Sequence, residues 1–321
     1  MEIITSINDF KKLKSSVITV GNYDGIHKGH HDVLSYIVKE GKKRNIPSCL
    51  ITFDPNPFYV LSNKIIPINL QSKDLKLKAL EELGLDKVLI IPFTKNFSLM
   101  SANVFAQTIL KDLFNPELIS VGTNHYFGHN KEGDLSFLKT FCQENNIQLH
   151  VPEMIEREGN TISSSLIRSL ILDGDIGKVY NFLGRFYGFN ATIVPGSNRG
   201  KTMNYPTANF IPTSEKQLLP STGVYLSRVF LEGKNYFGMT NAGIRPTFNE
   251  KKFVMEVHIL SDKFGNLYDK QFYIEFLDKI RDEIKFDNKE LLIKQIEKDK
   301  EVCIKLIDTF KAVSYTHLTL P

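Results

Sequence analysis

The sequence lacks long apolar runs, paired cysteines and a strong charge of either sign. No apolar stretch approaches the roughly 20 residues that a helix needs to cross a bilayer, and the chain does not start with the basic-then-apolar order of a secretory signal. We therefore expect a cytoplasmic protein that is not inserted in a membrane.

The three cysteines, Cys49, Cys142 and Cys303, are odd in number and far apart. Their spacing excludes a disulfide framework and any CxxC zinc or redox motif, and favours buried structural thiols. The formal net charge is only +4, and basic runs such as residues 39–44 are short and interrupted, as on a solvated helix face. Because nucleic-acid-binding proteins usually concentrate a basic face, nucleic acid is not expected as a partner.

What the sequence does contain indicates two globular domains of different kinds. A length of 321 residues exceeds what one hydrophobic core usually supports. Up to about residue 183, short β-branched runs alternate with segments of helical period, which is typical of βαβ units around a parallel sheet. The expected strands are residues 16–21, 47–53, 87–93, 118–122 and 148–154, and the expected helices are residues 30–43, 72–83, 101–113, 132–145, 163–172 and 175–183.

From Arg185 onward, apolar strands follow one another with Gly, Pro and Asn turns and no helices between them. This pattern predicts an antiparallel Greek-key β-barrel, against which a final helix from Asn288 to about residue 311 packs. We thus expect an α/β domain over residues 1–183 and a barrel domain over residues 184–311. Residues 312–321 fit neither pattern and contain VSYTHLT, the translation of a transposon adaptor used in sequencing libraries, so we expect them to be a non-native tail.

The stretch GNYDGIHKGHH directly follows the first expected strand and leads into the first long helix. Such a turn at the carboxyl end of a parallel strand is where ligands bind in open α/β sheets. Gly21, Gly25 and Gly29 let the backbone approach a ligand closely, and the helix N-terminus attracts anions. His27 and His30 project from the same side and can hold phosphate oxygens as charge develops during nucleotidyl transfer.

Two other interpretations of this stretch are less favoured. A zinc site would need an HExxH helix or a third ligand at a known spacing, and neither is present. The dinucleotide motif GxGxxG is also absent, because the glycines are spaced four and four. A nucleotide-phosphate site is therefore the preferred hypothesis.

A second glycine-containing segment, GSNRGKT, is one residue short of the P-loop pattern GxxxxGK[ST]. The following MNYPTANF contains a proline and a short β-like run, which argue against the helix that a P-loop requires. A loop with Gly196, Arg199, Gly200 and Lys201 can still bind phosphate through charge and backbone N–H groups.

Four ordered motifs of the first domain resemble one enzyme family. GNYDGIHKGHH is similar to the GxFDGxHxGH signature of the HxGH nucleotidyltransferases, with Tyr23 in place of phenylalanine. ITFDPNP, VGTNHYFGHNKEGD and ISSSLIR resemble, in order and spacing, further segments of the Rossmann-like module of bacterial bifunctional riboflavin kinases/FMN adenylyltransferases, or FAD synthetases.

This resemblance implies roles for particular residues. His27, His30 and Arg168 would be catalytic. Hydroxyls, N–H groups and a guanidinium at the start of a helix can bind a triphosphate. On its own, SSSLIR would be an ordinary Ser-capped helix. The implied ATP-binding residues are Gly21, Asp24, Gly25, Gly29, Asn124, Ser164 and Ser165, and the implied flavin-binding residues are Phe53, Pro55, Tyr126 and Phe127.

The second domain is similar to riboflavin kinases. LGRFYGFNATIVPGSNRGKTMNYPTANF resembles their opening segment, and STGVY, NAGIRPTF, VMEVHIL, GNLYDK and IRDEIKFDN match later segments in order. The resemblance implies that Thr207 and Asn209 bind Mg²⁺ and phosphates, that Glu256 is the general base, and that Arg281 helps to close the flavin or nucleotide site.

Together the resemblances imply a bifunctional enzyme that phosphorylates riboflavin to FMN and then adenylylates FMN to FAD with release of pyrophosphate. ATP is the implied co-substrate, Mg²⁺ or another divalent cation the implied metal, and a monomer or weak homo-oligomer the expected state. One alternative is a single-function HxGH nucleotidyltransferase whose barrel only binds flavin, which PTAN and the downstream Glu256 argue against. Another is a non-catalytic flavin-storing or RNA-binding protein, which would need a continuous basic face that the sequence does not show.

Overall fold

The computed structural model describes residues 1–62, 68–153, 156–157, 159–195, 205–246, 251–260 and 270–315. The chain forms two compact units, Met1–Ile66 with Lys73–Ser164 and Pro67–Ser72 with Ser165–Pro321. Within the described ranges, no helix combines the length and apolarity that a membrane span requires. The expected phosphate loop with Gly196, Arg199, Gly200 and Lys201 lies outside the described residues.

The first unit is built on a six-stranded parallel sheet, which confirms the expected α/β fold. The strands follow the order β1-β4-β3-β2-β5-β6, so the order reverses at the boundary between β2 and β5. In open α/β sheets, ligands bind beyond the carboxyl ends of the strands at such a switch point. The strands are β1 (Glu2–Ile4), β2 (Ser16–Val20), β3 (Ser48–Asp54), β4 (Lys87–Pro92), β5 (Pro116–Ser120) and β6 (Gln148–His150).

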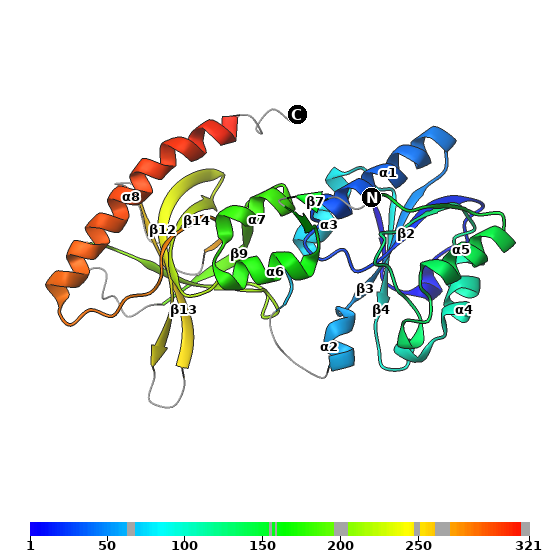
Figure 1. Ribbon diagram of the computed structural model, residues 1–321, viewed down its shortest axis with the longest axis horizontal. Coiled ribbons are helices and arrows are strands. Elements are labelled where there is room, and N and C mark those ends of the chain that lie inside the picture. The colour runs from blue at the N-terminus through cyan, green and yellow to red at the C-terminus, as the bar shows by residue number, and fades with distance from the viewer. Residues whose placement is uncertain are drawn as a thin grey trace. The chain divides into compact units, whose positions relative to one another are not determined.

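Helices cover both faces of this sheet (Figure 1). Successive apolar strand residues point to opposite faces, so Val17 belongs to the core beneath α1 and α3, and Ile18 to the core beneath α4 and α5. The helical elements of this unit are η1 (Ile7–Asp9), α1 (Lys28–Arg44), α2 (Pro57–Ser62), α3 (Lys73–Glu82), η2 (Phe97–Leu99), α4 (Ala102–Phe105), the π-helical η3 (Ala106–Lys111), η4 (His129–Lys131) and α5 (Leu135–Glu144). A short hairpin, β7 (Glu156–Arg157) and β8 (Asn160–Thr161), follows the sheet.

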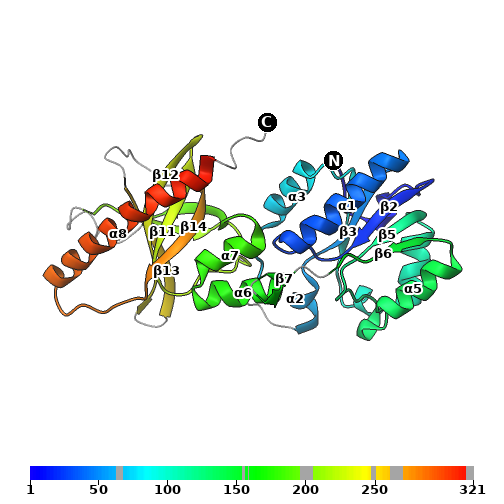
Figure 2. The ribbon, with the colours of Figure 1, turned by 45° about the horizontal axis from the view of Figure 1, so that its top comes forward.

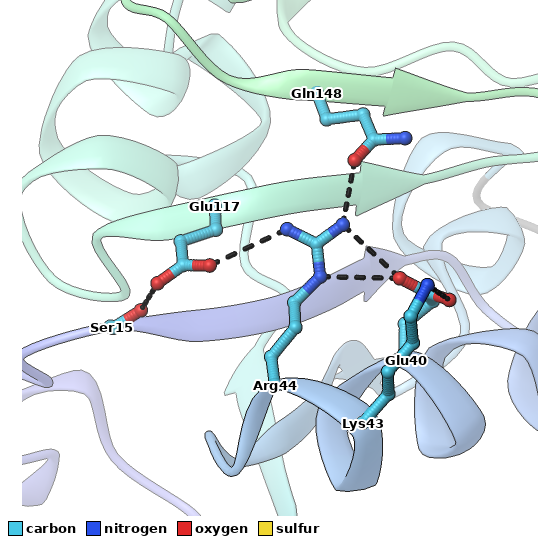
Figure 3. Close-up of polar contacts among 6 residues, drawn as sticks. All are labelled: Ser15, Glu40, Lys43, Arg44, Glu117 and Gln148. Atoms are coloured by element: carbon cyan, nitrogen blue, oxygen red, sulfur yellow. Dashed lines mark hydrogen bonds and ion pairs between the residues drawn. The ribbon is translucent and has the colours of Figure 1, made fainter.

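A charged network closes the amino-terminal edge of the sheet, away from the switch point (Figure 3). Arg44, the last residue of α1, donates to Glu40 of its own helix, to Glu117 of β5 at 3.4 Å and to Gln148 of β6 at 2.6 Å. Ser15 donates to Glu117 at 2.6 Å. The guanidinium therefore ties the helix to two neighbouring strands.

The second unit is a closed barrel of six antiparallel strands in the order β10-β13-β12-β11-β14-β9 (Figure 2). Strands β11, β12 and β13 are consecutive neighbours, and β14 returns to lie beside β11, which is a Greek key. The expected Greek-key barrel is thus confirmed. Its strands are β9 (Tyr187–Val194), β10 (Ala208–Pro212), β11 (Gly223–Leu231), β12 (Lys234–Pro246), β13 (Lys251–Ile259) and β14 (Gln271–Arg281).

Three helices accompany the barrel: α6 (Ser164–Asp173), α7 (Ile176–Leu183) and α8 (Lys289–Tyr315). Asn288 caps α8 by accepting a hydrogen bond from the Leu291 N–H at 2.9 Å. Cys303 and Ile307 of α8 are buried in one cluster with barrel residues such as Leu226, as expected for the final helix.

A short segment from between α2 and α3 also belongs to the second unit. Asn69 donates its N–H to the Lys216 carbonyl at 3.0 Å and accepts from the Leu218 N–H at 2.9 Å. The chain therefore crosses from one unit to the other more than once. A single domain boundary at residue 184 stays a prediction.

Candidate functional site

The loop between β2 and α1 lies at the switch point and has an unusual backbone. Tyr23, Gly25 and Ile26 have φ values of 50°, 85° and 36°. Glycine adopts positive φ readily, but for a ring-bearing or β-branched residue such a conformation costs about 1–3 kcal/mol. The contacts around the loop must therefore hold this conformation.

Tyr23 anchors the loop from inside. Its ring is buried, and its hydroxyl forms a hydrogen bond with Thr19 Oγ1 in the core. Burial raises the pKa of Tyr23, so the phenol stays neutral. A Cβ at position 21 would lie 2.9 Å from the Tyr23 ring, so Gly21 is needed here to admit that ring.

Two carbonyls of the loop are held from outside. The Asn22 carbonyl accepts from Lys76 Nζ at 3.2 Å and from Thr52 Oγ1 at 3.3 Å. The carbonyl of the buried Asp24 accepts from Ser164 Oγ at 3.0 Å. Sequence reasoning identified Asp24 and Ser164 but missed Lys76, which no local pattern marks. It gave no role to Thr52, although Thr52 lies in the ITFDPNP segment.

His27 and His30 lie together at the start of α1. Their rings stack with centroids 3.6 Å apart and an interplanar angle of 17°, and the Tyr23 ring lies 4.7 Å from His30. His27 is buried and is the N-cap of the helix, with its Nδ1 accepting the His30 N–H at 3.2 Å. This bond fixes the proton of a neutral His27 ring on Nε2, which makes that atom a donor.

The neighbouring positions are consistent with this assignment. A Cβ at Gly29 would lie 3.4 Å from His27 Nδ1, so the helix backbone passes close to that ring. His31 is exposed and its Nδ1 lies 3.2 Å from Ser35 Oγ, so it belongs to the helix surface. The two stacked rings and the first N–H groups of α1 therefore form a donor-rich site suited to phosphate.

The other predicted nucleotide-binding residues divide between the two units. Asn124 is exposed in the loop after β5, at the same switch point as His27. Ser165 and Arg168 are on α6 in the second unit, where the Arg168 Nε donates to the Ile68 carbonyl at 2.8 Å. Their ATP-binding roles stay predictions.

The predicted flavin-binding residues of the first unit have different environments. Tyr126 is 54% exposed, whereas Phe127 is buried in the core with its ring 5.4 Å from that of Phe105. Phe53, near the end of β3, packs against neighbouring phenylalanine rings and precedes Pro55 by two residues. Tyr126 is thus the aromatic side chain most open to a ligand in this set, and Phe127 has a packing role.

In the barrel, amide and carboxylate side chains lie opposite one another on three neighbouring strands. Asn209 of β10 and Asn241 of β12 are both directly paired with Glu256 of β13. Directly opposite residues in antiparallel strands share a face. Thr207 Oγ1 donates to Glu256 Oε2 at 3.2 Å. The predicted Thr207, Asn209 and Glu256 are therefore brought together, and Asn241 joins them although sequence reasoning missed it.

This donor set fits Mg²⁺ when the metal also binds a nucleotide. In the part of the chain that the structure describes, no three His, Cys, Asp or Glu side chains form a metal-binding group. A hydroxyl, an amide and one carboxylate are hard oxygen ligands, and Mg²⁺ usually takes few protein ligands and completes its shell with water and substrate phosphates.

His258 contacts the segment that carries Thr207. It lies two residues after Glu256, is buried, and its Nδ1 is 2.9 Å from the Pro206 carbonyl. Pro206 directly precedes Thr207, so this contact fixes the entry into the PTAN segment. Burial lowers the pKa of His258, which favours the neutral ring.

Arg281 engages the final helix. Its Nε and Nη2 donate to the Asp299 carboxylate at 3.0 and 2.7 Å, and its Nη1 donates to the Asp282 carbonyl at 2.9 Å. Asp299 is 3% exposed and also accepts from Gln295 Nε2 at 2.8 Å. The guanidinium thus fastens α8 to β14, and its expected role at the flavin site stays a prediction.

A parallel sheet with a histidine pair at its switch point and a barrel with a Thr–Asn–Glu cluster define a two-domain, nucleotide-dependent transferase. The family models agree with both parts: residues 9–166 match FAD synthetase, and residues 183–307 match riboflavin kinase. The chain belongs to the family of bifunctional riboflavin kinases/FMN adenylyltransferases.

Curated relatives match over nearly the full chain. A bifunctional riboflavin kinase/FMN adenylyltransferase of Buchnera aphidicola subsp. Schizaphis graminum is 33% identical, over 95% of this chain and 98% of the relative. The enzyme of the same name from Escherichia coli K12 is 31% identical, over 94% and 96%. A solved structure described as a macrolide-efflux protein from Streptococcus pneumoniae superposes with a TM-score of 0.85 at 28% identity, over 94% of this chain and 99% of that one.

The protein is therefore an enzyme with two activities, riboflavin kinase and FMN adenylyltransferase, which use ATP and flavin substrates. The alternative of a non-catalytic barrel is not supported, because the barrel itself matches the riboflavin kinase family.

Proposed function

We propose that the two reactions occur at two separate sites, with His27 and His30 serving adenylyl transfer, and Thr207, Asn209 and Glu256 serving phosphorylation. The observation that carries the proposal is the stacked histidine pair at the start of α1, in which the N-cap bond directs the His27 proton to Nε2. Two donors at a helix N-terminus match a reaction in which negative charge builds on phosphate oxygens.

In adenylyl transfer, a phosphate oxygen of FMN attacks the α-phosphorus of ATP, and pyrophosphate leaves. The chain need not form a covalent bond, so its task is to align the two phosphates and stabilise the charge of the transition state. His27 and His30 donate to the α-phosphate oxygens. For Ser164, Ser165 and Arg168, the role of holding the departing phosphates rests on the sequence resemblance alone. Asn124 contacts the adenosine.

In phosphorylation, the 5′-hydroxyl of the ribityl chain attacks the γ-phosphorus of ATP, and ADP leaves. Glu256 accepts the hydroxyl proton, and Thr207, 3.2 Å from Glu256 Oε2, orients the carboxylate. Mg²⁺, held by Thr207 and Asn209 together with the phosphates, would neutralise charge on the transferred group. The phosphate-binding role of residues 196–201 rests on the sequence alone.

The test is to separate the activities with single substitutions. With riboflavin and Mg-ATP, His30→Ala should accumulate FMN and form no FAD, as measured by chromatography. Glu256→Gln should leave riboflavin unchanged yet convert supplied FMN to FAD. His31→Ala is the matched control, because His31 is exposed on the helix surface, and it should retain both activities. FAD formation by His30→Ala at the unsubstituted rate would overturn the histidine assignment.

A further inference from the structure

A partly buried lysine lies directly beneath the histidine loop of the first unit. Lys76, on α3, donates to the Asn22 carbonyl at 3.2 Å and to Thr52 Oγ1 at 3.3 Å. Thr52 is fully buried and in turn donates to the same Asn22 carbonyl at 3.3 Å. Nζ, Oγ1 and the carbonyl oxygen thus form a closed triangle that joins α3, β3 and the loop.

The position of this triangle in the loop is significant. Asn22 immediately precedes Tyr23, the first of the residues with positive φ, and the turn continues through Ile26 to His27. A loop that is locally strained keeps one conformation only if its surroundings fix it. Lys76 and Thr52 fix its beginning, as Ser164 fixes the carbonyl of Asp24.

The surroundings of Lys76 disfavour its positive charge. Burial lowers the pKa of Lys76, while the carboxylates of Asp24 and Asp54 act in the opposite direction. A lowered pKa for a cationic group means that folding disfavours its charged form at every pH below that pKa. Burial disfavours the charged form of this lysine, yet Nζ donates to the carbonyl next to Tyr23, which points to a functional reason for its presence.

We propose that Lys76 is a positioning residue of the adenylyltransferase: through the Asn22 carbonyl it holds the loop in the conformation that places His27 and His30 for phosphate. This rests on the proposed function of the two histidines. Lys76 acts through the loop backbone rather than on the reacting atoms, so its loss should lower kcat for FAD formation more than it raises KM for FMN.

The first test is Lys76→Met, which keeps the length of an apolar stem and removes the donors and the charge. We expect kcat for FAD formation from FMN to fall at least tenfold and KM for FMN to change less than threefold. Riboflavin phosphorylation by the same sample should be unchanged, which shows that the second unit is folded and active. The unfolding midpoint of the first unit should stay close to that of the unsubstituted enzyme, because the lysine is only partly buried and Thr52 still donates to the Asn22 carbonyl.

The matched control is Lys78→Met, on the same helix, where the lysine side chain is 73% exposed and pairs with Glu82 at the surface. It should retain both activities. If Lys76→Met also forms FAD at the unsubstituted rate, Lys76 has no positioning role. If His30→Ala forms FAD at the unsubstituted rate, the proposed function of the histidines fails, and the two failures are therefore distinguishable.

A rescue experiment separates positioning from a general structural role. Lys76→Cys followed by aminoethylation with 2-bromoethylamine rebuilds an ammonium at nearly the original reach. Burial raises the pKa of Cys49, Cys142 and Cys303 to about 12, 11 and 12, so these thiols contain little reactive thiolate near pH 8.5. Position 76 should be modified first, as mass spectrometry can verify.

We expect the unmodified Lys76→Cys variant to show the same loss as Lys76→Met, and the aminoethylated variant to recover at least a third of the original kcat. Complete modification at position 76 with no recovery of FAD formation would contradict the proposal. The unsubstituted enzyme treated with the same reagent controls for damage elsewhere.

Discussion

The Arg281–Asp299 pair provides a quantitative test of how the barrel holds its final helix. Asp299 is 3% exposed and receives three N–H contacts from Arg281 at 2.7–3.0 Å. Removing one partner of a buried pair costs about 3–5 kcal/mol, because the remaining charge is left without compensation. Since the Arg281 side chain is 17% exposed and Gln295 still donates to Asp299, we expect the lower end, about 3 kcal/mol, for Arg281→Met.

At about 2–4 °C per kcal/mol for a unit of this size, the unfolding midpoint of the barrel should fall by about 6–12 °C. Differential scanning calorimetry measures this shift, and thermal inactivation of the riboflavin kinase activity assigns it to the barrel. The double substitution Arg281→Met/Asp299→Leu should recover at least half of the loss, because it replaces both charges by apolar groups. Lys178→Met, which breaks a half-exposed pair with Asp175, should cost no more than about 1 kcal/mol.

Arg281 does not hold α8 in this way if Arg281→Met shifts the midpoint no more than Lys178→Met does, or if the double variant is no more stable than the single one. The same variants test the expected flavin role of Arg281. If Arg281 also binds flavin, the double variant should regain stability but keep a raised KM for riboflavin; if its role is to hold α8, KM should return together with stability.

Two further predictions concern buried groups. His258→Leu should lower kcat of the kinase about tenfold while FAD formation from FMN is unchanged. His258→Asn, whose amide can donate to the Pro206 carbonyl, should retain most of the kinase activity. Equal loss in both variants would show that the hydrogen bond to Pro206 does not support the kinase reaction. Cys49, Cys142 and Cys303 should resist a thiol reagent at pH 8 in the folded enzyme, since burial raises their pKa values to about 12, 11 and 12, and all three should react in guanidinium; rapid labelling of the folded enzyme would contradict their burial.

The parts of the fold with strong periodic patterns were predictable from the sequence. Strands β2 to β5 carry β-branched or otherwise apolar residues that are buried on both faces, and such runs stand out against the helices between them. The pairing of His27 with His30 was also predictable, because residues three apart at the start of a helix lie on the same side. The role of Glu256 was less predictable, because it came from a family resemblance and the pattern of its strand gives no sign of it.

Other features depend on contacts between distant parts of the chain. The triangle of Lys76, Thr52 and Asn22 joins residues up to 54 positions apart. Asn22 and Thr52 lie in quoted motifs but Lys76 lies in none, so the sequence does not show that the three meet. Segment 68–72 joins the second unit through hydrogen bonds with residues 216–218, for which its composition gives no signal. β1 has only three residues, too few for a periodic pattern to be recognised. The bond of Arg281 to α8 likewise becomes visible only when the barrel and the helix are assembled.

The central claim is that each reaction has its own site, and a mixing experiment tests it most directly. His30→Ala and Glu256→Gln are incubated with riboflavin and Mg-ATP, first separately and then together, and the flavins are separated by chromatography. We predict FMN without FAD from His30→Ala and unchanged riboflavin from Glu256→Gln. FAD should form only in the mixture, because FMN made by one variant is adenylylated by the other. FAD from either variant alone, or none from the mixture, would contradict the central claim.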